Sequence, residues 1–184
     1  SSKGWKRMAK QMKRGGRREK PEFDQKLLDL ARVTRVVKGG RRFRFRATLV
    51  IGNRKGKVGV GVAKGADVSD AIQKAFNDAK KSMVSVALVG GTIAHDVYAK
   101  YGSAKVMIKP GKEGRGLIAG GAVRAVADLL GVKDIVSKSL GSSNSLNLAR
   151  ATVLALGELR NVPEASPVVA PKEELKVVET ESKK

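Results

Sequence analysis

The chain contains no cysteine among its 184 residues, so disulfide bonds, thiolate metal sites and a cysteine nucleophile are all excluded. Its only histidine, His95, has no serine or second base near it in a recognisable catalytic spacing. No apolar run is long enough for a membrane span or for the core of a signal peptide. These absences predict a soluble intracellular protein that is not an enzyme and uses neither a metal nor a cofactor.

Aromatic side chains are also scarce, with one Trp, two Tyr and four Phe in the whole chain. Sheet modules that bind single-stranded RNA stack bases on exposed aromatic residues. Residues 57–64, "KVGVGVAK", have the outline of such a motif, but none of its aromatic positions is filled. The sequence therefore predicts that base stacking is not the binding mode.

Acidic residues are few relative to basic ones, which leaves a formal net charge of +21 at pH 7. The excess is spread along the chain, because the first twenty residues carry +8 and residues 21–163 carry +14. A large excess of one sign repels itself and weakens a compact fold, and a partner of opposite charge relieves that repulsion. A polyanion is therefore the expected partner.

Glycine and lysine are concentrated in residues 52–65, "GNRKGKVGVGVAKG", which raises the possibility of a phosphate-binding loop. A Walker loop requires four residues after its first glycine and a Ser or Thr after its lysine, but three residues separate Gly52 from Gly56, and Val58 follows the lysine. The dinucleotide fingerprint GxGxxG also fails, because the last spacing is one residue too long. Neither nucleotide motif is present.

The run before this stretch alternates between two faces, as a β-strand requires. The expected core face carries Phe43, Phe45, Ala47 and Leu49. The opposite, cationic face carries Arg42, Arg44, Arg46 and Thr48. The pattern predicts the first strand of a hairpin.

The hairpin turn is predicted to place Gly52, Asn53 and Gly56 at positive φ. The return strand then has Val58, Val60 and Val62 on one face and Gly59, Gly61 and Ala63 on the other. A glycine face leaves room either for a close-packed helix or for the backbone of a ligand, and we favour the helix.

Helix and strand signals along the rest of the chain predict an α+β fold. A strand is expected over residues 27–37, with a helical first turn as the alternative, and a helix is expected from a cap at Asp67 or Ser69 to Met83. The second half is expected to contain strands over residues 92–97, 103–109 and 134–139 and helices over residues 122–130 and 145–159.

We expect four parts along the chain: a basic flexible arm over residues 1–25, domains over residues 26–89 and 90–162, and a flexible tail over residues 163–184. The arm has only three apolar side chains, Trp5, Met8 and Met12, to form a membrane-surface or targeting helix. An arm that orders on a polyanion is the favoured alternative.

Five segments closely resemble, in order and spacing, bacterial small-ribosomal-subunit protein five, the S5 family. They read "VVKGGRRFRF", "GKVGVGVAKGADV", "AIQKAFNDAKKSM", "GSAKVMIKPGKEGRGLIAGGAVRAV" and "GSSNSLNLARAT", and the match covers roughly residues 27–159. The resemblance implies an amino-terminal domain like a double-stranded-RNA-binding domain, with a three-stranded sheet and one helix. It also implies a carboxy-terminal domain with a four-stranded sheet and two helices.

The resemblance further implies small-subunit ribosomal RNA as the ligand, near the neck and decoding region, and an influence on translational accuracy. Other small-subunit proteins are implied as partners, with protein S4 as the neighbour on the side where messenger RNA enters; no homo-oligomer is expected. The family's contact loop falls on Lys38, Gly39, Gly40 and Arg41, and its S4 interface on Gly114, Gly116 and Arg124.

The chain departs from the family at Val60, Val62 and Ala63, where an aromatic residue and a glycine are usual. No aromatic contact is therefore expected from this strand. The cations instead suit phosphate contact and shape readout of folded RNA. The predicted RNA-binding residues are the contact loop together with Arg42, Arg44, Arg46, Arg54, Lys55, Lys57 and Lys64.

Two other classes of function compete with this one. Residues 110–122, "PGKEGRGLIAGGA", resemble the phosphate loop ahead of a helix in small-molecule kinases, but no pair of acidic residues for magnesium and no catalytic base accompany them. The second alternative is a double-stranded-RNA-binding or DNA-binding protein outside the ribosome.

Overall fold

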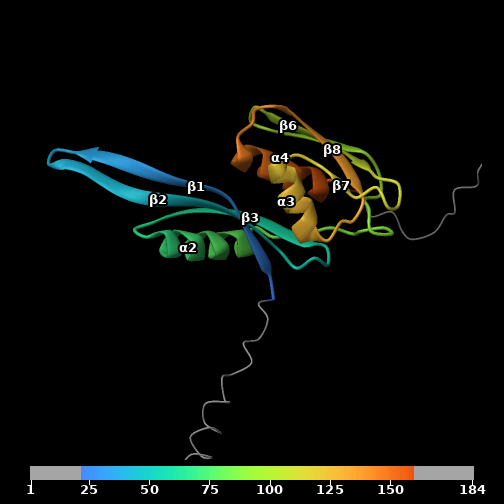
Figure 1. The fold of residues 1–184 in the computed structure, drawn as a ribbon, viewed down its shortest axis with the longest axis horizontal. Coiled ribbons are helices and arrows are strands. Elements are labelled where there is room, and N and C mark those ends of the chain that lie inside the picture. The colour runs from blue at the N-terminus through green and yellow to red at the C-terminus, as the bar shows by residue number, and fades with distance from the viewer. Residues whose placement is uncertain (1–21, 160–184) are drawn as a thin grey trace, which may run out of the picture.

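The computed structural model describes residues 22–159, which form an α+β protein of two domains (Figure 1). The predicted basic arm and tail fall almost entirely on residues 1–21 and 160–184, which lie outside the described part. The amino-terminal domain has a four-stranded sheet in the order β1-β2-β3-β4 and one helix, α2. Its elements are β1 (Asp24–Val37), β2 (Gly40–Gly52), β3 (Lys57–Gly65), α2 (Val68–Lys81) and β4 (Val84–Ser85).

The fourth strand of this sheet, β4, contains only two residues, too few to leave a signal in the sequence. It pairs antiparallel with the beginning of β3 and follows directly after α2. The predicted sheet of three strands with one helix is therefore confirmed, with β4 added at one edge.

Strands β1 and β2 form a hairpin that extends well past α2 (Figure 1). Val37 pairs with Gly40 across a two-residue turn. The prediction of one core face and one cationic face is wrong at both ends of β2: Phe43 is 50% exposed, whereas Thr48, on the cationic face, is buried. Alternation identifies the face on which a side chain lies, but not where along the strand the covering layer ends.

The glycine face of β3 packs directly against α2, as the favoured alternative predicts. A Cβ atom on Gly61 would lie 2.1 Å from the Ala75 carbonyl oxygen, and one on Gly59 would lie 2.4 Å from the Ala79 carbonyl oxygen. The helix presents alanines at this contact, at the spacing of one helical face. Small residues on both sides let the helix backbone approach the sheet closely.

The start of α2 differs in detail from the predicted cap. Asp67 is the N-cap residue, but its side chain makes no capping hydrogen bond. The carboxylate of Asp70 instead accepts hydrogen bonds from the Ala66 amide at 3.3 Å and the Lys74 ammonium at 2.8 Å. The hydrogen bond from Lys74 is the main cause that lowers the pKa of Asp70.

The other face of the amino-terminal sheet is buried against the second domain. Val50, Val58 and Val60 belong to one continuous core with residues of both later helices. Leu49 and Ile51 point the other way and share a smaller core with the alanines of α2. The sheet is thus covered on both faces over its proximal half.

The second domain contains a four-stranded sheet in the order β5-β6-β8-β7 and two helices, as predicted. The strand expected over residues 92–97 is wrong, because the first strand begins at Val97 and the residues before it form a loop. The two-residue strand β7 is an addition to the predicted elements. The elements are β5 (Val97–Tyr101), β6 (Ala104–Pro110), β7 (Leu117–Ile118), α3 (Gly121–Leu130), β8 (Ile135–Gly141) and α4 (Ser145–Gly157).

The turn between β2 and β3 is held against the C-terminal end of α3. The positive φ angles predicted for Gly52 and Asn53 are wrong, because Arg54 (φ 55°) and Gly56 (φ 92°) adopt them. The amide of Arg54 donates to the Leu129 carbonyl at 2.9 Å, and the amide of Gly56 donates to the Leu130 carbonyl at 2.9 Å. The last carbonyls of a helix have no partner within the helix, and here the amide groups of the β2–β3 turn in the other domain donate hydrogen bonds to them.

We predict that Gly61→Ala destabilises the protein by about 2–3 kcal/mol, because the added methyl group has no space between β3 and the backbone of α2. Gly39→Ala is the matched control, since no atom lies within 4 Å of the Cβ position there. Chemical denaturation of both variants measures the free energy of unfolding. Equal stabilities would contradict the close packing of helix and sheet.

Candidate nucleic-acid interface

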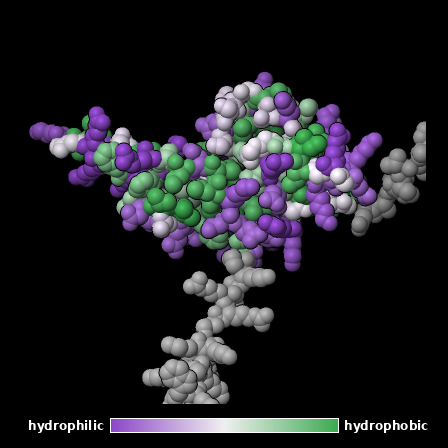
Figure 2. Space-filling model, in the orientation of Figure 1, coloured by the Kyte–Doolittle hydropathy of each residue, from purple (hydrophilic) through white to green (hydrophobic). Residues whose placement is uncertain are grey.

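The projecting end of the β1–β2 hairpin carries six cations and no acidic residue over residues 31–45. All six are exposed: Arg32, Arg35, Lys38, Arg41, Arg42 and Arg44. Figure 2 shows hydrophilic side chains gathered on this end of the molecule. Charges of one sign on a narrow projection create a strong local positive potential.

The tip of the hairpin contains the predicted contact loop of Lys38, Gly39, Gly40 and Arg41. Gly40 has φ 134°, a conformation that side-chain-bearing residues rarely adopt. No atom lies within 4 Å of the Cβ position of Gly39 or of Gly40. The backbone at the tip is therefore open to the approach of a large partner.

Four cations from three strands meet along one side of the hairpin. Arg35 pairs with Arg42 between β1 and β2, and Lys64 of β3 lies across from Arg46. Arg35, Arg42, Lys64 and Arg44 line a groove of about 270 Å³ whose other lining residues are Val33 and Thr34. No carboxylate lines the groove, so an anion there would meet only positive charge.

Three of these groove cations, Arg42, Arg44 and Lys64, are predicted RNA-binding residues. Arg35 is not among the predicted residues, and neither is Arg32, although both lie on the predicted strand over residues 27–37. The signal that could have found Arg35 is the pairing of β1 with β2, which places it directly beside Arg42.

Arg46 differs from the other arginines on its face. Its guanidinium lies 3.5 Å from the Asp29 carboxylate, and its Nε atom is buried without a hydrogen-bond partner. Part of its charge is therefore used inside the protein. The structure places Arg46 where the hairpin joins the core, rather than on the projecting end.

The turn cations Arg54, Lys55 and Lys57 lie at the opposite end of the sheet. The thirteen residues of β2 separate them from the hairpin tip by about 40 Å. The predicted RNA-binding residues therefore form two groups rather than one continuous surface.

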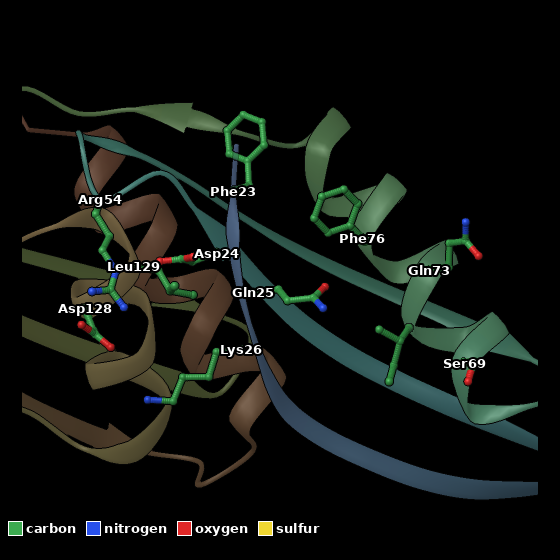
Figure 3. A pocket seen from close by; sticks show the side chains of 11 residues that line it. Phe23, Asp24, Gln25, Lys26, Arg54, Ser69, Gln73, Phe76, Asp128 and Leu129 are labelled. Atoms are coloured by element: carbon green, nitrogen blue, oxygen red, sulfur yellow. Dashed lines mark ion pairs between the residues drawn. The ribbon is translucent and has the colours of Figure 1, made fainter. Parts of the chain in front are cut away.

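Arg54 also has acidic neighbours, unlike the six cations on the projecting end of the hairpin. Its Nε atom lies 3.0 Å from the Asp24 carboxylate. Both residues line a hollow of about 810 Å³ between the start of β1, α2 and the end of α3. Figure 3 shows Arg54, Asp24 and Asp128 on one side of this hollow and Phe76 with Gln73 on the other. The turn group is thus less strongly positive than the hairpin group.

The predicted protein interface lies in the other domain, on the loop before α3. Gly114 and Gly116 have φ angles of 79° and 76°, and the structure leaves space around both. The Gly116 amide donates to the Asp134 carboxylate at 2.6 Å, and Arg124 donates to the Leu117 carbonyl at 2.8 Å. Arg124 is exposed, and its hydrogen bond also ties α3 to β7.

Other kinds of site find no support in the part of the chain that the structure describes. Residues 22–159 contain no group of three or more metal-ligating side chains. Over the same residues, no helix is both long and apolar enough to cross a membrane.

Comparison with known protein families matches both domains to one family. Residues 23–87 match ribosomal protein S5, N-terminal domain, and residues 99–166 match ribosomal protein S5, C-terminal domain. The small ribosomal subunit proteins uS5 of Campylobacter jejuni strains 81-176 and RM1221 are each 55% identical to the chain over 139 residues. These alignments cover 76% of the chain and 95% of each relative.

We predict that Asp134→Ala speeds hydrogen exchange of the Gly116 amide about tenfold or more, because the variant cannot form the hydrogen bond to a charged acceptor. Asp134→Asn is the control, since its side-chain oxygen can still accept this hydrogen bond. Exchange followed by NMR in the full chain measures the effect. An unchanged rate in Asp134→Ala would show that this carboxylate does not hold the loop.

Proposed function

Because the chain belongs to the ribosomal protein S5 family, we propose that it works as a structural protein of the small ribosomal subunit and binds that subunit's RNA. The known members of this family are ribosomal proteins and not enzymes. Their place is the ribosome in the cytoplasm.

The groove on the hairpin is the observation that carries the proposed mode of RNA binding. Its four cations face a space of about 270 Å³ with no competing carboxylate. Contacts from arginine and lysine to phosphate oxygens position the RNA and carry no direct base readout. Binding is then governed by the path of the RNA backbone and depends strongly on salt.

The length of the hairpin favours contact with folded RNA rather than with a flat surface. The hairpin extends past α2 and is exposed on both faces at its end (Figure 1). A narrow cationic strand pair of this kind can enter the space between RNA helices. We propose that its tip, with Gly39 and Gly40, reaches the RNA of the neck and decoding region.

We further propose that the loop before α3 contacts the S4 protein on the side where messenger RNA enters. The resemblance assigns Gly114, Gly116 and Arg124 to that contact. The open space around both glycines supports it, because a partner's backbone could approach there. Through this contact the protein would influence translational accuracy.

We predict that replacing Arg42, Arg44 and Lys64 together by Ser weakens binding to a transcript of bacterial small-subunit ribosomal RNA and flattens its salt dependence. The slope of log K against log salt should decrease by about one unit for each phosphate that the variant no longer neutralises. Filter binding at several salt concentrations measures both quantities.

The matched control replaces Lys74, Lys80 and Lys81 of α2 by Ser, which removes the same charge from another part of the domain. This control should retain nearly the parent slope. Equal effects in the two triple variants would mean that net charge, and not the groove, determines binding. Binding of the parent protein to any duplex RNA as tightly as to ribosomal RNA, without incorporation into subunits, would favour a protein outside the ribosome.

We predict that Arg124→Glu weakens association with purified S4 protein and increases misreading in cells. Arg124→Met is the control, because it also removes the hydrogen bond to the Leu117 carbonyl but introduces no negative charge. The expected order of association is parent, then Met, then Glu, measured by calorimetry. Normal association and accuracy in the Glu variant would count against an interface role for Arg124.

A further inference from the structure

Phe43 is an exposed aromatic side chain on the projecting end of the hairpin. It lies on β2, and 50% of its surface is accessible. Phe45, two residues further along the same face, is partly buried and packs against the core under α2. The successive side chains on this face are about 7 Å apart, so Phe43 lies just outside the area that the helix covers.

The ring of Phe43 already has a cation over it. The guanidinium carbon of Arg32 lies 4.7 Å from the ring centroid. This cation–π contact holds the Arg32 guanidinium over one face of the Phe43 ring. Arg32 and Phe43 are contributed by the two neighbouring strands of the hairpin, so their relative position is fixed by the β1–β2 ladder.

The surroundings of Phe43 are strongly positive. Over residues 31–45 the chain has six cations and no acidic residue, and the groove cations of β1, β2 and β3 lie on the opposite face of the sheet. A partner that lies against Phe43 must therefore tolerate a high density of positive charge. An apolar protein surface would be poorly matched to these surroundings, whereas a nucleotide has both an aromatic base and a phosphate.

We propose that Phe43 stacks on an unpaired nucleobase of the bound RNA, with the Arg32 guanidinium on the other side of the ring. The groove face of the hairpin holds phosphates while the opposite face holds this base. The proposal rests on the RNA binding proposed for the hairpin, and it adds a single stacking interaction. One exposed ring is not a stacking platform, so phosphate contacts still supply most of the affinity.

Stacking and phosphate contact leave different signatures in the salt dependence of binding. Stacking of a neutral base releases no counterions, so removing it lowers affinity at every salt concentration without changing the slope. Truncation of a stacking aromatic residue weakens nucleic-acid binding by about 5- to 100-fold. These two quantities separate a role of Phe43 from a role of the groove cations.

The experiment compares Phe43→Ala, Phe43→Leu and Phe43→Tyr in the full chain. The probes are a transcript of small-subunit ribosomal RNA, which contains unpaired bases, and a fully paired RNA duplex, which offers mainly phosphates. Ala and Leu should weaken binding to the transcript about 5- to 100-fold with an unchanged salt slope, whereas Tyr should bind like the parent. Binding to the duplex should be the same for all. Tyr98→Ala is the matched control, since Tyr98 is 53% exposed on the other domain.

A second measurement observes the stacking directly. Phe43→Trp should show fluorescence quenching when the transcript is added and little quenching with the duplex. The parent's single tryptophan, Trp5, gives the background signal to be subtracted. Quenching above that background with the transcript alone would support the proposal.

Several outcomes would overturn the proposal. Parent-like binding of Phe43→Ala would do so, and so would full binding by Phe43→Leu, which would indicate a merely apolar contact. Normal RNA binding combined with poor incorporation into subunits would assign Phe43 to a protein neighbour instead.

If the Arg42, Arg44 and Lys64 variant loses affinity while the Phe43 variants do not, only the stacking inference fails. If neither set loses affinity, the hairpin site of the proposed function fails as well.

Discussion

Close packing of helix α2 on the glycine face of β3 is the interaction on which the amino-terminal domain depends. Gly59, Gly61 and Gly65 leave no space for a side chain between the strand and the helix backbone. Because the helix is only 14 residues long, it covers the proximal half of the hairpin and no more. The distal half has no covering layer, and its polar and charged composition is what a strand pair without a core requires. The extent of one helix thus determines which part of β1 and β2 can meet a partner.

The length of α2 also separates the cations that have acidic partners from those that have none. In the covered half, Arg46 and Asp29 form an ion pair, and Arg54 and Asp24 form another at the far turn. In the uncovered half, acidic residues are absent over residues 31–45 and the groove cations have no carboxylate beside them. Mutual repulsion of these cations weakens the free hairpin, and a polyanion would relieve it. The same cations therefore lower the stability of the free hairpin and favour its binding to a polyanion.

Much of this architecture could be predicted from the sequence, because it depends on local periodicity. The glycine spacing of β3, the alanine face of α2 and the glycine that ends α3 each leave a signal within a few residues. The expectations that the structure contradicts depend on distant segments. Phe43 is predicted to lie in the core because alternation contains no information about the length of the covering helix. The pairing of Arg46 with Asp29 and the positive φ of Arg54 likewise depend on another strand and on α3. The groove could be predicted only in part, since Arg35 enters it through strand pairing.

The hydrogen bonds between the β2–β3 turn and the end of α3 have a mechanical consequence. The two domains share one hydrophobic core and are joined by backbone hydrogen bonds at Arg54 and Gly56, so no flexible hinge separates them. The hairpin and the second domain therefore move together as one rigid body. A rotation of the second domain by about 5° would move the hairpin tip by about 3.5 Å over the roughly 40 Å length of β2. A small change in the orientation of the second domain would therefore displace the tip by about the length of a hydrogen bond. Conversely, contacts that fix the position of the tip would also fix the orientation of the second domain.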